Sequence, residues 1–219
     1  MKQHTPSRFC GSCVIAGTLL CGVMGAALHL LRPDYNPLRN FLSEYLVGPF
    51  GFLGTAAAYL MAATFLMLLI GLRLSVHPSG FLTASCVLIG VMIICVCVCA
   101  VFPIDLFPPD GSRPPFTRAG IIHLVSSALL FLSLIALILT LPSAYKRDEE
   151  WRLFSQTTLF FGFLFLVSFL GLILVPHHLR GLAERVMSLP VGIWLLLTGL
   201  RLRQPPNDQT YDRAFGQID

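Results

Sequence analysis

Side chains able to do chemistry gather in three segments, each of which follows a long apolar run. In chain order they are Ser43, Glu44, Asp105, Asp110, His123, His177 and Arg185. Acids, histidines and hydroxyls can transfer protons or bind a metal, and arginine matches the geometry of phosphate. These residue types are therefore suited either to a hydrolytic metal site or to a site that binds a polar headgroup.

One use of these residues is a zinc site. His123, His177 or His178, and Asp105 would supply three ligands, leaving an open position for a water that attacks a lipid ester or amide. Ser43 would polarise the substrate. Adjacent histidines on a helix diverge by about 100°, so both binding one ion is awkward, and no HExxH spacing is present. We keep this hydrolase as an alternative and expect no cofactor.

A second use is binding of a lipid headgroup without chemistry. The arginines placed to grip a phosphate are Arg118, Arg180 and Arg185. The purely structural alternative is that these residues close the outer end of the bundle. Asp105 would then pair with Arg185 and Asp110 with Arg118, and Glu184 would help to cap the last span. For His123, the structural alternative is a hydrogen-bonded packing residue, because it shares a helix face of small and polar residues with Gly120 and Ser126.

The elements that must position these groups are membrane spans. The chain has 219 residues, of which 55% are hydrophobic and only 12% charged, about half the charge of a soluble domain. Six segments reach the roughly 20 apolar residues that cross a bilayer: 10–31, 50–72, 80–102, 119–141, 155–175 and 186–202. This predicts an all-α, polytopic bundle of six transmembrane helices, with a leader at 1–9 and a disordered cytoplasmic tail at 203–219.

A short amphipathic helix is predicted between the first two spans. Apolar residues recur there at helical spacing: Leu38, Phe41, Leu42, Tyr45 and Leu46. Asn36 is a suitable cap and Pro37 suits the first turn. We expect this helix to lie at the membrane interface, with Ser43 and Glu44 on its polar face.

The distribution of charge predicts the orientation. With both termini cytoplasmic, nine of the fifteen Lys and Arg residues lie on the cytoplasmic side, as the positive-inside rule favours. The charged loop 142–153 would then be cytoplasmic and solvated, and the candidate residues would lie on the outer face. The net charge of +4 is modest and scattered, so nucleic acid is not an expected partner. Glycines of the first span, at 11, 17, 22 and 25, predict close packing inside the bundle.

Four motifs in order resemble a known family. PDYNPLRNFLSEY, FPIDLFPPD, GIIHLVSSALLF and GLAERV are similar to the prokaryotic multi-pass family called domain of unknown function 998, over roughly 10–202. Ser43-Glu44 and His123 also resemble, more distantly, the eukaryotic Frag1, DRAM and Sfk1 group. The resemblance implies six spans, a prokaryotic cytoplasmic membrane and a connection to lipids, without a catalytic set.

The leading hypothesis is a membrane protein that binds or organises lipid headgroups or partner helices through an outer-face polar site. That site comprises Ser43, Glu44, Asp105, Asp110, His123 and Arg185. Membrane lipids, a membrane-protein partner or a second copy of the chain are the expected partners. A small-solute transporter is a third hypothesis, which the lack of an acid or base near the middle of the spans disfavours.

Overall fold

The computed structural model describes residues 4–106, 108 and 115–204. These residues form six long helices, two short 3-10 helices and no strand. The elements are α1 (His4–Leu31), η1 (Leu42–Leu46), α2 (Gly51–Ser75), α3 (Gly80–Val101), α4 (Arg118–Tyr145), α5 (Phe154–Leu174), η2 (His177–Leu179) and α6 (Arg180–Arg203). The predicted all-α fold with six spans is therefore confirmed.

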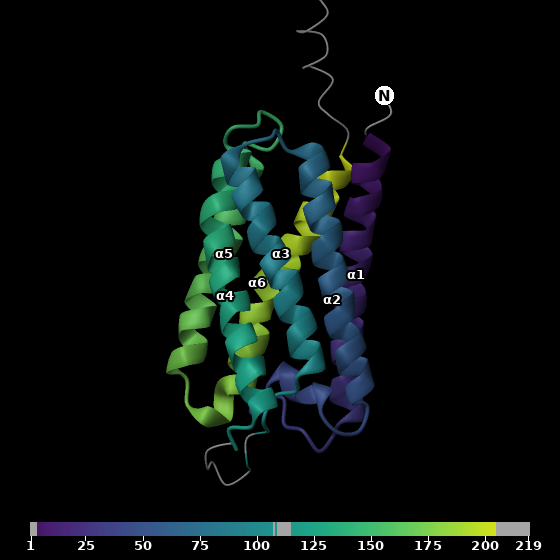
Figure 1. The fold of residues 1–219 in the computed structure, drawn as a ribbon, viewed down its shortest axis with the longest axis vertical. Helices are drawn as coiled ribbons and strands as arrows, with labels where there is room; N and C mark the ends of the chain where they lie inside the picture. Colours follow the sequence, from purple (N-terminus) through teal and green to yellow (C-terminus); the bar gives the residue numbers. More distant parts are fainter. Residues whose placement is uncertain (1–3, 107, 109–114, 205–219) are drawn as a thin grey trace, which may run out of the picture.

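The six helices form a closed ring in chain order (Figure 1). Each long helix packs against its neighbours in the sequence, and α6 returns to pack against α1. His4 and Gln204 lie at one end of the bundle, here called the terminal end. The connections after α1, α3 and α5 lie at the opposite end, here called the distal end. The ring therefore brings segments far apart in sequence together at the distal end.

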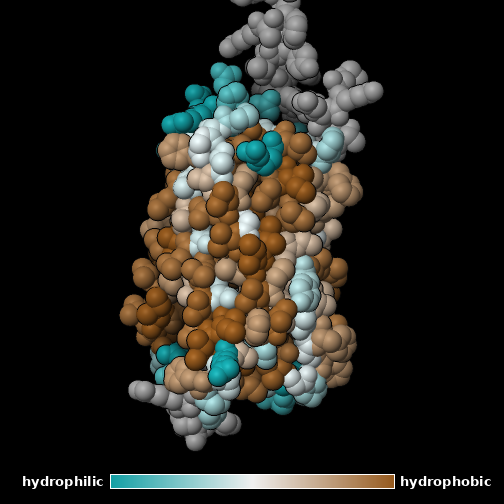
Figure 2. Space-filling view, in the orientation of Figure 1, coloured by the Kyte–Doolittle hydropathy of each residue, from teal (hydrophilic) through white to brown (hydrophobic). Residues whose placement is uncertain are grey.

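The surface of the bundle has the polarity expected in a lipid bilayer. All six long helices are long and apolar enough to cross a membrane. Figure 2 shows hydrophobic residues over the middle of the molecule and hydrophilic ones gathered toward its two ends. Large apolar side chains such as Leu139 and Phe163 point outward, which costs nothing in hydrocarbon. The chain is a multi-pass membrane protein.

Only part of the glycine surface of α1 packs inside the ring. A Cβ on Gly11 would lie 2.5 Å from the Gly199 carbonyl oxygen of α6, and one on Gly17 would lie 2.1 Å from Thr64 Oγ1 of α2. Gly22 and Gly25 have no such neighbour within 4 Å. The predicted close packing thus holds for the first two glycines and is wrong for the last two.

The charged loop after α4 is not merely solvated. Trp151 is buried and stacks on Tyr145 with ring centroids 4.8 Å apart, and its indole Nε1 donates to the Ser75 carbonyl oxygen at 3.2 Å. The Asp148 carboxylate accepts from the His77 amide at 2.7 Å. The loop therefore closes the terminal end against the α2–α3 turn, because its aromatic residue gains more from burial than its charges lose.

The segment after α1 is less helical than its pattern predicts. It makes turns around Asn36 and becomes helical only over Leu42–Leu46, as a 3-10 helix. A Cβ on Gly181 would lie 2.5 Å from the Asn40 carbonyl oxygen, so this segment packs directly on the start of α6. The Leu182 amide also donates to the Leu38 carbonyl oxygen at 3.0 Å. Tertiary contacts with α6 replace the regular hydrogen bonds of an interfacial helix.

Candidate functional site at the distal end

Arg185 joins three elements at the distal end. Its Nε donates to His29 Nε2 of α1 at 2.8 Å. Its Nη1 donates to the Asn40 carbonyl oxygen at 2.8 Å and to the Gly181 carbonyl oxygen at 2.7 Å. Arginine supplies five N–H donors in a fixed plane, which suits it to link α1, the α1–α2 segment and α6.

The contact with Arg185 fixes the tautomer of His29. Arginine only donates, so His29 Nε2 must accept and carry no proton. The proton then lies on Nδ1, which donates to the Gly25 carbonyl oxygen at 2.5 Å. His29 is thereby held by its own helix and aimed at Arg185, which makes it a positioning residue for the guanidinium.

Tyr45 packs against the same pair. Its side chain is 1% exposed, and its ring centroid lies 5.1 Å from that of His29 and 5.1 Å from that of Tyr35. The Arg185 Cζ lies 5.7 Å from the Tyr45 ring. Burial raises the pKa of the Tyr45 phenol above its usual value, although the charge of Arg185 opposes this shift. The phenol therefore keeps its proton and remains a donor.

Two donors in this cluster have no acceptor. The Tyr45 hydroxyl and Arg185 Nη2 are both shielded from solvent, and neither makes a hydrogen bond of ordinary geometry within the described residues, although the guanidinium lies close enough to the phenol to oppose the rise of its pKa. Leaving a buried polar group unpaired costs about 1–3 kcal/mol, so native proteins rarely do it without a water, ion or ligand. The cluster is therefore complementary to an acceptor.

Two carboxylates border the donors. Glu44, 2% exposed, accepts from the Phe41 amide at 3.2 Å and from Asn40 Nδ2 at 2.5 Å. Glu184 accepts from the Leu42 amide at 2.5 Å. The two carboxylates thus bind successive backbone amides, and neither forms an ion pair inside the described part of the chain. Glu44, which the pattern places on the polar face of an interfacial helix, is buried because η1 packs on α6.

Arg32 fixes the segment that carries Tyr45. Its guanidinium forms a salt bridge of 2.8 Å with Asp34 and donates from Nη1 to the Val47 carbonyl oxygen at 2.7 Å. The Arg32 Cζ lies 3.8 Å from the Tyr35 ring centroid. The hydrogen bond with Asp34 raises the pKa of Arg32, and that with Arg32 lowers the pKa of Asp34. These contacts hold Tyr35 against Tyr45.

Asp105 belongs to a separate structure. Its carboxylate accepts from the Thr117 amide at 2.9 Å and from the Thr117 hydroxyl at 2.6 Å. Thr117 in turn accepts from the Gly120 amide at 3.0 Å, as the N-cap of α4. The lid pairing of Asp105 with Arg185 is wrong, because the start of α4 offers donors beside Asp105 while Arg185 turns toward α1.

His123 is a packing residue at the α3–α4 contact. It is 3% exposed, and its Nδ1 lies 2.8 Å from the Phe102 carbonyl oxygen, at the end of α3. His177 is exposed in η2 and does not join it. No group of three His, Cys, Asp or Glu residues suited to a metal occurs in the part of the chain that the structure describes. His123, His177 and Asp105 are thus not brought together as zinc ligands there.

The remaining candidates are dispersed. Ser43 is half-buried within η1, and Arg118 and Arg180 begin α4 and α6 at the distal end. Asp110, with its suggested bond to Arg118, lies outside the described residues. Of the predicted outer-face set, Glu44 and Arg185 therefore lie at one cluster, and Asp105 and His123 lie at the α4 contacts.

Sequence reasoning missed His29, Asn40 and Tyr45 as members of the cluster. Tyr45 was assigned to an apolar face because its spacing matches Phe41 and Leu42. His29 stands alone near the end of the first span, and only the contact of α1 with α6 turns it toward Arg185. The sequence feature that could have indicated these residues is Arg185 itself. A cation at the start of a span needs hydrogen-bond acceptors nearby.

Comparison with known proteins agrees with this fold. A family model described as a protein of unknown function, DUF998, matches residues 15–201. The chain belongs to the DUF998 family. No curated protein and no solved structure matches it, so the likeness to the Frag1, DRAM and Sfk1 group stays a prediction. The residues gathered around Arg185 all lie within the match, namely His29, Asn40, Glu44, Tyr45 and Glu184.

A polar hollow also exists at the terminal end of this DUF998 protein. It measures about 450 Å³ and is bordered by Arg73, His77, Asp148 and Arg201. The Arg201 Nη2 donates to the Glu150 carbonyl oxygen at 2.6 Å, and its Cζ lies 5.3 Å from the Trp151 ring. Polar side chains therefore gather at the terminal end as well as at the distal end.

Proposed function

We propose that this protein binds the headgroup of a membrane phospholipid at its distal cluster, the residues His29, Asn40, Glu44, Tyr45, Glu184 and Arg185. The observation that carries the proposal is the pair of buried donors without an acceptor, the Tyr45 hydroxyl and Arg185 Nη2. Phosphate oxygens accept several hydrogen bonds and pair strongly with guanidinium. One phosphate group would satisfy both donors.

The charges of the cluster favour a headgroup that carries both signs. Arg185 supplies one positive charge, and the Glu44 carboxylate, held close by through the Phe41 amide, supplies a negative one. A purely anionic headgroup would meet this carboxylate, while the ammonium of a zwitterionic headgroup would be attracted to it. The expected ligand is therefore a phosphate with a nearby ammonium, as in phosphatidylethanolamine.

Entry to the cluster requires movement of the α1–α2 segment. The two unpaired donors are shielded from solvent, and the segment is held on α6 by the contacts of Asn40 with Arg185 and Leu42 with Glu184. Binding would exchange part of these contacts for contacts with the headgroup. The distal end lies where such a headgroup would be, next to the ends of the spans.

The proposed orientation has the distal end outside and both termini in the cytoplasm. The excess of Lys and Arg on the terminal side supports it. Alkaline phosphatase fused after Arg203 should be inactive in a bacterial host, whereas a fluorescent protein fused there should fluoresce. Active phosphatase at this position would reverse the orientation.

The lipid proposal is tested with purified protein from which lipid has been removed. Native mass spectrometry after addition of phosphatidylethanolamine should detect a bound lipid, and phosphatidylglycerol should bind less. Tyr45→Phe should weaken binding, because one donor to the phosphate is lost. Tyr59→Phe is the matched control, since it removes the hydroxyl of an exposed tyrosine of α2 outside the cluster and should bind normally.

Stability in lipid-free detergent separates binding from folding. Without lipid, Tyr45→Phe removes a hydroxyl that has no partner, so its melting temperature should equal or exceed that of the native chain. Added lipid should then raise the melting temperature of the native chain more than that of the variant. Equal lipid binding and equal shifts in Tyr45→Phe, Tyr59→Phe and the native chain would refute the proposal.

A further inference from the structure

The segment between α1 and α2 is held in two different ways along its length. Its second part, residues 45–50, lies directly on the first turns of α2. A Cβ on Gly51 would lie 2.5 Å from the Leu46 carbonyl oxygen. One on Gly54 would lie 2.9 Å from the Tyr45 carbonyl oxygen, and the Tyr45 side chain is buried. This part is therefore seated on α2 by close backbone contact and by a buried aromatic ring.

The first part, residues 36–42, is here called the latch, and none of its residues is buried. Three hydrogen bonds fasten it to the start of α6: the Leu182 amide to the Leu38 carbonyl oxygen at 3.0 Å, Arg185 Nη1 to the Asn40 carbonyl oxygen at 2.8 Å, and the Leu42 amide to Glu184 at 2.5 Å. A further bond, from Arg39 to the Pro108 carbonyl oxygen, uses a long side chain that can follow a movement of the backbone. Hydrogen bonds can be exchanged for bonds to water at a small net cost, whereas exposing buried apolar surface to water is costly. The latch is therefore the part of the segment that separates most easily.

The latch keeps its own shape through bonds inside it. The Asn36 side-chain oxygen accepts from the Leu38 amide at 2.9 Å, and the Asn36 carbonyl oxygen accepts from the Asn40 amide at 2.8 Å. At the boundary with the seated part, the Glu44 carboxylate accepts from the Phe41 amide and from Asn40 Nδ2. These bonds join residues at most four positions apart, so they can persist while the latch turns about Glu44. Opening the latch consequently breaks mainly its contacts with α6.

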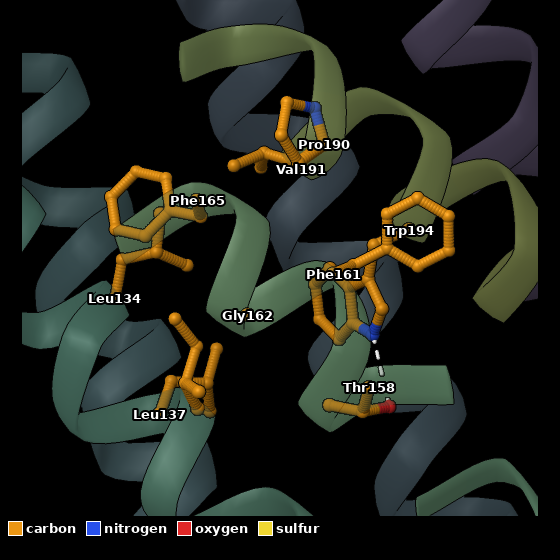
Figure 3. Close-up of a pocket in the computed structure, with 10 residues that line it drawn as sticks. Leu134, Leu137, Thr158, Phe161, Gly162, Phe165, Pro190, Val191 and Trp194 are labelled. Carbon is orange, nitrogen blue, oxygen red and sulfur yellow. Dashed lines mark hydrogen bonds between the residues drawn. The ribbon is translucent and has the colours of Figure 1, made fainter. Parts of the chain in front are cut away.

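Helix α6, on which the latch lies, is anchored by its middle turns. Figure 3 shows Val191 and Trp194 of α6 facing the same small space as Phe165 of α5. The Trp194 Nε1 donates to the Thr158 hydroxyl of α5 at 3.1 Å, as the dashed line marks. Both of these side chains are buried. Helix α6 therefore stays in place, with Arg185, when the latch separates from it.

We propose that the latch opens and closes as a unit over Arg185, while residues 45–50 stay seated on α2. An open latch withdraws the Asn40 carbonyl oxygen from Arg185 Nη1 and uncovers that side of the guanidinium. Tyr45 keeps its place, because it belongs to the seated part. The open state thus presents Arg185 and Tyr45 without dismantling the cluster. The latch follows from these contacts alone, and only its use as the entrance for a lipid rests on the headgroup proposal.

Amide hydrogen exchange tests the latch in detergent without lipid. Leu182 lies in the first turn of α6, where no helical carbonyl accepts its amide, so the protection of this amide depends on the latch. The Leu42 amide depends in the same way on Glu184. After correction for intrinsic rates, both amides should exchange at a similar rate. They should also exchange at least about tenfold faster than the Gly51 amide, which bonds to Gly48 in the seated part, because local opening needs less free energy than wider unfolding.

One substitution tests whether the fastenings open together. Glu184→Ala removes the acceptor of the Leu42 amide but leaves the hydrogen bond of the Leu182 amide intact. Exchange at Leu182 should nevertheless become about two- to tenfold faster, the effect of one lost hydrogen bond on a shared opening. Asp148→Ala is the matched control, since it also removes a carboxylate that accepts a backbone amide, that of His77 at the terminal end. It should leave exchange at Leu182 unchanged.

Three results would overturn the latch. Unchanged exchange at Leu182 in Glu184→Ala would mean that the contacts open separately. An equal increase at Gly51 would mean that the whole segment leaves α2, and an equal increase at Leu182 in Asp148→Ala would mean general loosening.

If Glu184→Ala does not fold, the native chain is measured in low concentrations of denaturant. Leu42 and Leu182 should then follow one opening and Gly51 a second one of higher free energy. Separate openings of Leu42 and Leu182 would contradict a latch that moves as a unit. None of these readouts uses lipid, so the latch and the headgroup proposal can fail separately.

Discussion

At the scale of single residues, Arg185 determines what the distal end can do. It donates three hydrogen bonds, to His29, Asn40 and Gly181, and its Nη2 has no acceptor. Most of its binding capacity is thus structural, and only one nitrogen remains for a ligand. This division makes the guanidinium a rigid donor rather than a mobile phosphate clamp.

His29→Ala should destabilise the protein by about 1–3 kcal/mol, because it leaves the part-buried Nε of Arg185 without an acceptor. The measurement is thermal or chemical unfolding in detergent. His178→Ala is the control, since His178 is exposed in η2 and should change stability by less than about 0.5 kcal/mol. Equal stability of the two variants would mean that His29 does not hold Arg185.

The sequence indicated the two charged residues of the cluster but not their partners. Glu44 and Arg185 stand out because charges beside apolar spans are costly. Tyr45 has the spacing of an apolar face, and the partners Asn40 and Gly181 bind through backbone carbonyls, which no side-chain pattern reports. The site could therefore be found only from the contact of α6 with the α1–α2 segment, which joins residues 145 positions apart.

At the scale of elements, the start of α4 is stabilised by two caps in series. Asp105 accepts from Thr117, and Thr117 accepts from the Gly120 amide. A carboxylate at a helix N-terminus also interacts favourably with the helix dipole. The distal end of α4 is thus held independently of the Arg185 cluster.

A double-mutant cycle distinguishes this arrangement from an ion-paired lid. Asp105→Ala should cost about 0.5–2 kcal/mol, like other losses of a cap. Its effect should be non-additive with Thr117→Ala, since the two side chains bond each other. It should add to that of Arg185→Ala within about 0.5 kcal/mol. Strong coupling of Asp105 to Arg185 would contradict the contacts described.

The glycines of α1 make a matched pair for testing helix packing. Gly17→Ala would bring a Cβ within 2.1 Å of Thr64 Oγ1 and should destabilise the α1–α2 contact, by about 1–3 kcal/mol as for other overpacked sites. Gly22→Ala meets no neighbour within 4 Å and should cause no loss. Unfolding curves of both variants in the same detergent test this. A larger loss in Gly22→Ala would show that this face is also packed.

At the scale of the whole molecule, the ring of six helices was only partly predictable. Hydropathy and length define the spans well, because each must satisfy its backbone within lipid. The ends were less certain, since α1 begins at His4 and α6 at Arg180, both six residues before the predicted spans. Tertiary contacts, not hydropathy, stabilise these first turns. At the terminal end Arg8 of α1 donates to the Arg203 carbonyl oxygen at 3.1 Å, and at the distal end Leu182 of α6 donates to the Leu38 carbonyl oxygen at 3.0 Å.

The order of helices around the ring is not encoded in hydropathy. All six spans are apolar nearly all round, so no strong hydrophobic face indicates which helix each one contacts. Close approach of Gly11 to Gly199 instead brings α1 against α6. That contact closes the ring and thereby assembles the distal cluster. The cluster of the headgroup proposal consequently depends on the close contact of α1 with α6, for which the only sign in the sequence was glycines scattered along the spans.

The most direct test of the headgroup proposal is an experimental density map of the protein in phosphatidylethanolamine nanodiscs. We expect density for a phosphate within hydrogen-bonding distance of both the Tyr45 hydroxyl and Arg185 Nη2, with the headgroup ammonium toward Glu44. A map in which these two donors bond only to each other or to an ordered water, with no lipid beside them, would contradict the proposal.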